Sequence, residues 1–439
     1  MRYAFWLIRE LIHKRGLFLG TGLSLGLAVA LMSWKFVPFI AREWFSPLTR
    51  IGVVGEYSPT TLPLFIQKKL SLGLTQVGED GLPVPALASS WQIEDLGKTY
   101  IFVLRNDYVW HNGVRVRAKD VNYNIKNVTF TPLGDTTLKA TLQDPYSPFL
   151  TLVAKPIVTT GLRGFGSYKV MSLTLKGESV HRLRLAPVPD KASGQIEYRF
   201  YKTEAQAILA FKLGDVGQLH ELSSVQDVDD FPNTDISQHE SYDQIVALYF
   251  NLKNPLFVEK SVRQGLWLAL PPATREPVRS PLHKRSWAYA DIGRKYDSQE
   301  TAAKKLLSGS SIASPGAELT ITTFSYLEDT AQVIAAAWTR LGIPTRVKVE
   351  NVVPSDFEMF LTTASVPLDP DQYPFWHSTQ VTNITHYTNV KIDKLLEDGR
   401  KELDLEKRKK IYADFQRYLM EDAPAIFLYY PTVYSIHRK

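Results

Sequence analysis

Cysteine is absent from this sequence of 439 residues. Its absence excludes disulfides, thiol catalysis and cysteine-ligated metal sites. It also removes the lipid-bearing cysteine that can hold an exported protein at a membrane. Any attachment of this chain to a membrane would therefore need another feature.

The sequence also lacks the motifs of common enzyme classes. Its single Gly-x-Ser-x-Gly match, residues 22–26, lies inside the apolar N-terminal run, and the sequence contains no His-Glu-x-x-His and no Walker or kinase motif. The glycine-rich stretch 161–168 lacks the Lys-Ser/Thr pair of a phosphate loop, and it predicts a turn that opens a strand at Tyr168. We expect a binding protein without catalysis, cofactor or metal.

A strong charge bias is missing as well, since 51 basic residues stand against 45 acidic ones. This balance argues against a nucleic-acid partner, although a weak attraction to anionic lipid stays open. The longest basic run, residues 407–410, lies among acidic residues and predicts a solvated helix face. A hydrophobic content of 44% and the chain length predict a globular protein with two sizeable cores.

The N-terminal segment is basic and then apolar. Residues 1–16 predict a cytoplasmic segment, residues 17–40 a transmembrane anchor, and residues 41–50 a linker to an extracytoplasmic body. The alternative is a cleaved signal peptide, because Ala28-Val29-Ala30 resembles a cleavage site. In both cases the body is exported, to the periplasm or the cell exterior.

The stretch 83–123 carries the most information about local structure. We expect a short helix that ends at Trp91, a turn at Gly97, a strand over 99–105 and a tight turn at 111–113. A second helix should open at residues 118–120 and include 123–127.

This stretch resembles the signature of the family 5 solute-binding proteins of ABC importers, which include oligopeptide-, dipeptide- and nickel-binding proteins. The matching positions are Pro85, Leu87, Ala88, Ser90, Trp91, Tyr100, Phe102, Leu104, Arg105, Trp110, His111, Gly113, Asp120 and Val121. A second match is the apolar strand 245–251, which ends in Asn and is followed by Pro-x-Phe and Val-Arg-Gln. The resemblance covers nearly everything after residue 50.

The resemblance implies an α/β fold with two lobes, the type II periplasmic-binding fold. Lobe I would comprise 51–252 and 423–439, and lobe II would comprise 253–422. The small subdomain, about 80–155, is trimmed because the family's long segment after residue 124 is short here. In lobe II, a strand at 319–324, a helix at 329–341 and a strand at 343–349 predict a parallel pair.

The segment 368–376 resembles the family's cleft loop. The carboxylate that binds a peptide's ammonium group in the family would fall on Val366 or Pro367, so Asp369 or Asp371 would have to replace it. His377 and His386 lack a second close ligand, and no metal site is expected. The ligand-binding candidates are Tyr57, Asn251, Asp369, Asp371, Tyr373, Trp376, His377 and Asn383. The hinge candidates are Phe250, Asn251, Ala423 and Pro424.

The function implied by the resemblance is capture of a peptide or peptide-like solute by hinge closure and its delivery to the membrane subunits of an ABC permease. The protein would act as a monomer. The alternative is a membrane-anchored sensory or scaffolding protein that uses the same fold without import.

Overall fold

The computed structural model describes residues 14, 21, 22, 24, 26, 30, 47–189, 191–192, 194–225, 228–272, 274–292, 299–310, 312, 316 and 318–439. Most of the predicted segment 17–40 lies outside the described residues. No helix built from the described residues is long and apolar enough to cross a membrane.

Lobe I is built on a seven-stranded sheet in the order β12-β18-β11-β1-β10-β9-β8. Strand β1 lies inside this sheet and runs parallel to both β10 and β11. The strands are β1 (Leu48–Val54), β8 (Tyr168–Lys176), β9 (Ser179–Pro187), β10 (Gln195–Tyr201), β11 (Gln218–Leu222), β12 (Thr234–Glu240) and β18 (Thr432–Arg438). The helices are α2 (Leu64–Leu70) and α4 (Glu204–Lys212). Helix α4 begins where Thr203 caps it, since the Thr203 Oγ1 accepts from the Gln206 N–H at 3.3 Å.

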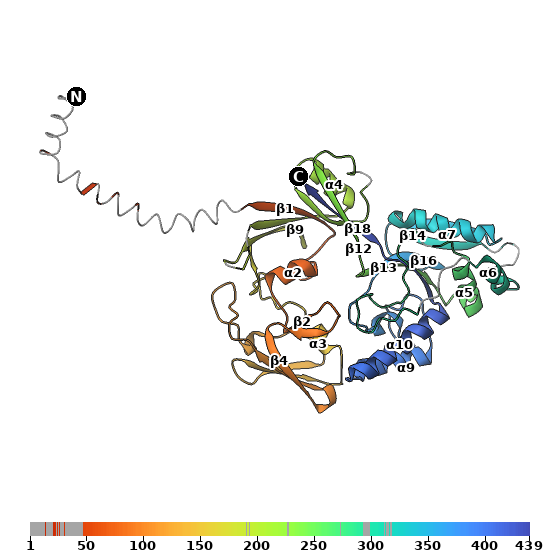
Figure 1. Cartoon of the computed structure of the whole chain (residues 1–439), viewed down its shortest axis with the longest axis horizontal. Helices are drawn as coiled ribbons and strands as arrows, with labels where there is room; N and C mark the ends of the chain where they lie inside the picture. The colour runs from red at the N-terminus through yellow and green to blue at the C-terminus, as the bar shows by residue number, and fades with distance from the viewer. Residues whose placement is uncertain are drawn as a thin grey trace, which may run out of the picture.

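The small subdomain lies below lobe I in Figure 1 and is a four-stranded antiparallel sheet in the order β4-β5-β7-β6. Its strands are β4 (Ala88–Glu94), β5 (Thr99–Leu104), β6 (Val128–Pro132) and β7 (Thr137–Leu142), and it also holds β2 (Thr75–Val77), β3 (Pro83–Pro85) and α3 (Phe149–Leu152). The predicted strand after Gly97 is confirmed as β5, and Gly97 has a positive φ of 89°.

Two predicted helices of this region are wrong. The segment that ends at Trp91 is strand β4, because it pairs with β5 and places Trp91 opposite Phe102. The helix at 118–120 is a single 3₁₀ turn, since the Val121 backbone is extended. Residues 123–127 form no helix, and Asn124 and Asn127 have positive φ angles of 50° and 63°.

Lobe II contains a five-stranded sheet in the order β15-β14-β16-β13-β17. Its predicted parallel strand pair is confirmed, because β14 and β15 pair in parallel on either side of helix α7 in the sequence. The strands are β13 (Gln244–Phe250), β14 (Leu319–Phe324), β15 (Thr345–Glu350), β16 (Met359–Ser365) and β17 (Ala425–Tyr429). The helices are α5 (Lys260–Leu268), α6 (Glu300–Leu307), α7 (Glu328–Arg340), α8 (Tyr373–Trp376), α9 (Val390–Lys401) and α10 (Leu405–Asp422).

The chain crosses between the lobes at two adjacent places. Residues 241–243 connect β12 of lobe I to β13 of lobe II, and residues 430–431 connect β17 back to β18. The lobe boundaries expected from the sequence, at 252/253 and 422/423, therefore fall at the ends of β13 and β17 that lie away from the crossings. The reason is that β13 is buried from Ile245 to Phe250 within the core of lobe II, where it pairs with both β16 and β17.

The backbone of the glycine-rich turn before β8 packs tightly against the backbone at the end of α2. The Gly166 N–H donates to the Leu70 carbonyl at 2.8 Å, and a Cβ added at Gly164 would collide with that same carbonyl. We expect Gly164→Ala to lower the free energy of unfolding by about 1–3 kcal/mol, since a backbone oxygen cannot move aside as a side chain can. Chemical denaturation would measure the change.

Gly134 provides the matched control, because a Cβ there meets open space. Gly134→Ala should leave the free energy of unfolding within about 0.5 kcal/mol of the parent. Equal stability of the two alanine variants would contradict the close contact at Gly164.

Candidate functional site

The loop that follows β16 lies at the lobe junction. Strands β14, β15 and β16 run parallel, so they end at the same edge of the lobe II sheet. The Val366 N–H, directly after β16, donates to the Asp243 carbonyl at 2.8 Å, and Asp243 belongs to the first crossing. The loop 366–372 therefore occupies the place where ligands bind in many α/β folds, beyond the carboxyl ends of strands.

Asp369 is buried in this loop and fully engaged. It is 7% exposed, and its Oδ1 accepts from Arg408 Nη2 at 3.2 Å and from the Asp371 N–H at 2.9 Å. Its Oδ2 accepts from Thr151 Oγ1 of the small subdomain at 3.2 Å. Burial raises the pKa of Asp369, and the positive charge of Arg408 acts in the opposite direction.

Asp371 forms a second ion pair two residues later. Arg400 Nε and Nη2 donate to its carboxylate at 2.9–3.0 Å, a two-pronged geometry that only arginine provides. Tyr146 Oη of the small subdomain donates to Asp371 Oδ2 at 3.1 Å. Burial, followed by the Asp371 charge, raises the pKa of Tyr146, so its hydroxyl stays protonated and remains a donor.

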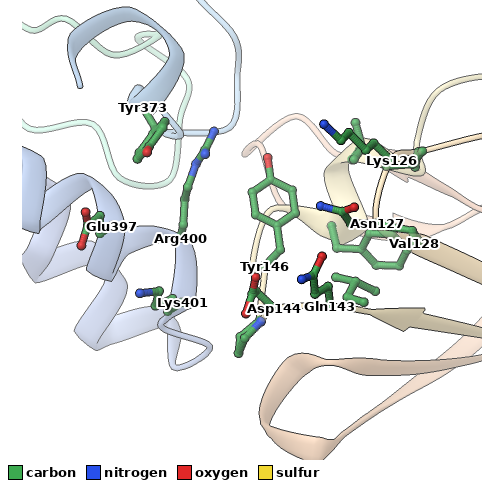
Figure 2. Close-up of a pocket in the computed structure, with 15 residues that line it drawn as sticks. Lys126, Asn127, Val128, Gln143, Asp144, Tyr146, Tyr373, Glu397, Arg400 and Lys401 are labelled. Carbon is green, nitrogen blue, oxygen red and sulfur yellow. The ribbon is translucent and has the colours of Figure 1, made fainter. Parts of the chain in front are cut away.

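A cavity of about 690 Å³ opens beside this second ion pair, between the small subdomain and lobe II. Figure 2 shows Arg400 and Tyr373 on the lobe II side facing Tyr146 and Asn127 on the other. The Arg400 guanidinium lies 3.9 Å from the Tyr373 ring centre and 5.4 Å from that of Tyr146. The lining residues are Ile125, Lys126, Asn127, Val128, Leu142, Gln143, Asp144, Pro145, Tyr146, Phe149, Leu152, Tyr373, Glu397, Arg400 and Lys401.

The cavity has the size and the mixed lining of a small-molecule site. Ligand pockets typically span roughly 300–1,000 Å³ and combine apolar walls with a few polar groups. Here apolar side chains of the small subdomain share the lining with Lys126, Arg400 and Lys401 as cations and with Asp144 and Glu397 as anions. Such a lining accepts an amphipathic molecule with charged groups of either sign.

The structure places the other predicted residues of the loop inside the protein. Trp376 is 3% exposed and packs its ring near Tyr249 and Phe427, so it belongs to the lobe II core. His377 is buried against Tyr373, and its Nδ1 accepts from the Thr379 N–H at 3.2 Å. The Asn383 Nδ2 donates to the Tyr387 carbonyl at 2.9 Å. Of the predicted loop residues, Tyr373 lines the cavity directly, whereas Trp376, His377 and Asn383 hold the protein interior together.

Tyr57 and Asn251 lie away from this cavity. Tyr57 Oη donates to the Val54 carbonyl at 3.2 Å and stays within lobe I. Asn251 follows the last residue of β13, whereas the crossing 241–243 precedes the first residue of this strand. The two ends of β13 are six residue steps of roughly 3.3 Å apart, which amounts to about 20 Å. Its Nδ2 donates to the Phe357 carbonyl at 2.9 Å, a contact that joins strand ends. The predicted binding and hinge roles of Asn251 do not fit this position.

The sequence did not indicate the partners of the two aspartates. Tyr146 and Thr151 belong to a proline-broken segment that showed no binding pattern. Arg408 was part of the basic run interpreted as a solvated helix face, but it is 6% exposed, and only its neighbours in 407–410 are exposed. The sequence held one indication of these partners, namely two carboxylates in a single loop next to apolar strands. Buried carboxylates require cations nearby, so this pair predicts basic side chains around the loop.

A comparison with family models matches residues 83–385 to the bacterial extracellular solute-binding proteins, family 5 Middle. The chain belongs to this family. Its members bind solutes, and this chain is accordingly a solute-binding protein and not an enzyme. The described residues contain no group of three His, Asp or Glu side chains that could hold a metal ion.

Individual relatives are distant. The oligopeptide-binding protein AppA of Bacillus subtilis is 29% identical over 226 residues, which span 42% of this chain and only 41% of AppA. The substrate-binding protein CtaP of Listeria monocytogenes superposes with a TM-score of 0.76 at 22% identity, over 90% of this chain and 94% of CtaP. NikZ of Campylobacter jejuni, solved with Ni(L-His), gives 0.72 at 24% identity over 89% and 94%. These structures support the two-lobed fold.

Proposed function

We propose that this family 5 protein captures a peptide or peptide-like solute between its lobes and delivers it to an ABC permease outside the cytoplasm. The observation that carries the proposal is the junction itself. Two short crossings, 241–243 and 430–431, join the lobes on one side, and side chains of the small subdomain contact lobe II on the other. Rotation about two adjacent crossings is a standard route to hinge closure around a ligand.

The relatives and the cavity together support this solute class. The AppA relative carries the name of an oligopeptide-binding protein. A peptide offers both an apolar body and charges of either sign, which matches the apolar residues and the five charged residues that line the cavity. In this proposal residues 17–40 anchor the chain in the membrane, and the body faces the periplasm or the cell exterior.

The test is thermal unfolding of the full chain in detergent with a pool of short peptides, together with native mass spectrometry of the protein as purified. We expect a higher melting temperature, since a ligand at about 100 times its Kd contributes about 2.7 kcal/mol. The matched control is the same pool after complete hydrolysis to amino acids, which should have a smaller effect. A ligand-free mass together with an unchanged melting temperature would contradict the proposed solute class.

A further inference from the structure

The contacts between the small subdomain and lobe II include a compact set of four hydrogen bonds. Tyr146 donates to Asp371, and Thr151 donates to Asp369. Ser147 adds two bonds to the end of α9, from its N–H to the Arg400 carbonyl at 2.7 Å and from its Oγ to the Gly399 carbonyl at 3.0 Å. We call the donors Tyr146, Ser147 and Thr151 with their acceptors Asp369, Asp371, Gly399 and Arg400 the interlobe latch.

The acceptors of the latch are rigidly held within lobe II. Arg400 and Arg408 fix the two carboxylates, and their own helices, α9 and α10, pack on each other. A carboxylate held by a guanidinium is a preorganised acceptor, and hydrogen bonds to charged groups are stronger than neutral ones. The donors meet fixed partners and lose little freedom when the lobes come together.

Every bond in the latch joins two groups of the protein, so no bond in it includes a solute. We propose that Tyr146 and Thr151 are positioning residues for solute capture, which latch the lobes together and so set how slowly a bound solute escapes. Escape requires the lobes to separate, so each latch bond adds to the barrier for opening. Entry occurs through the open form, which the latch makes rarer. This role in capture rests on the proposed function, whereas the latch itself does not.

Two isosteric changes remove the donors with little loss of packing. Tyr146→Phe and Thr151→Val delete one hydroxyl each, and they leave the Asp–Arg pairs in place. The matched control is Tyr108→Phe, which also deletes a tyrosine hydroxyl in the small subdomain. The Tyr108 ring packs on Phe165, and neither residue belongs to the interlobe latch.

The first readout is the distance between the lobes without solute. Since the chain has no cysteine, spin labels can be attached at Gly134→Cys in the small subdomain and Lys409→Cys on α10, both at exposed positions. We expect one narrow distance in the labelled parent and in Tyr108→Phe. The double variant Tyr146→Phe/Thr151→Val should add a longer distance. Identical distance distributions in parent and double variant would overturn the latch.

The second readout is the dissociation rate of a bound peptide, measured by stopped-flow displacement. We expect the double variant to release the peptide about tenfold faster, with no fall in the association rate, as expected when a closed state is destabilised by about 1.4 kcal/mol. A purely structural role would lower the active fraction and leave the dissociation rate unchanged, which would overturn the positioning role. If no peptide binds the parent, the proposed solute class fails, and the distance distributions still decide the latch.

Discussion

Replacing Arg408 by Met should lower the free energy of unfolding by about 3–5 kcal/mol at neutral pH, because it leaves the Asp369 carboxylate buried without its cation. The Arg408 Nε also donates to the Gly399 carbonyl at 2.8 Å, and its guanidinium lies 5.1 Å from the Trp287 ring centre. Methionine keeps much of the volume, so the loss reports the charge and the hydrogen bonds. Urea denaturation followed by circular dichroism would measure it.

The same variant should become relatively more stable in acid. Burial already raises the pKa of Asp369 from its ordinary value of 3.8, and loss of Arg408 raises it further. The folded variant then binds more protons than its unfolded chain, so its stability falls as the pH rises from about 4 through the folded-state pKa. The loss in free energy of unfolding relative to the parent should be larger at pH 8 than at pH 5. Asp369→Asn in the Arg408→Met background should abolish this difference, and a deficit independent of pH in the single variant would contradict the ion pair.

Arg263→Ala should be comparably destabilising, by about 3–5 kcal/mol. The Arg263 side chain is 4% exposed and makes its hydrogen bonds to backbone carbonyls. Its guanidinium donates to the carbonyls of Asp422 and Ala423 at the end of α10, and to those of Phe257 and Val258 before α5. Alanine would leave these carbonyls buried and unpaired. A guanidinium at the carboxyl end of a helix also complements the helix dipole, and that contribution is lost too.

Arg417→Ala is the control for this prediction. Arg417 lies on α10, the helix whose last carbonyls Arg263 binds, but it is half exposed, and it pairs with Asp414 at 2.7 Å. Such surface pairs contribute little, so the change should stay within about 1 kcal/mol. Arg263→Lys keeps the charge but cannot span two groups of carbonyls, and it should recover only part of the loss. Full stability of the lysine variant would show that charge alone, and not the forked geometry, matters.

The sequence predicted those parts of the fold that depend on local pattern. Alternation of apolar residues located β5, and the succession of strand, helix and strand located β14, α7 and β15. It failed for β4, because Ala88–Glu94 is extended only through pairing with β5, a contact between different segments. It drew the lobe boundaries after β13 and before β17, whereas the crossings lie at the other ends of these strands, since an apolar strand does not reveal which of two cores covers it.

The candidate site was predicted at the level of the loop but not of its chemistry. The sequence drew attention to the two aspartates of the loop but not to their neighbours Tyr146, Arg400 and Arg408. These partners lie about 30 to 225 residues away in the sequence, and only the packed lobes bring them together. Residues chosen for aromatic or polar character, such as Trp376 and Asn383, proved to be interior because a loop of polar composition can still fold onto a core.

Strand β1 gives the body of the protein a defined response to mechanical force. Residues 48–54 pair with β10 along their whole length and with β11 over three residues, both in parallel. A pull on the chain before residue 48 therefore acts along the strand axis and loads many hydrogen bonds at once in shear, instead of opening them one by one. Tension on the N-terminal segment would be borne first by the sheet of lobe I, and it would reach lobe II only through the crossings and the interlobe latch.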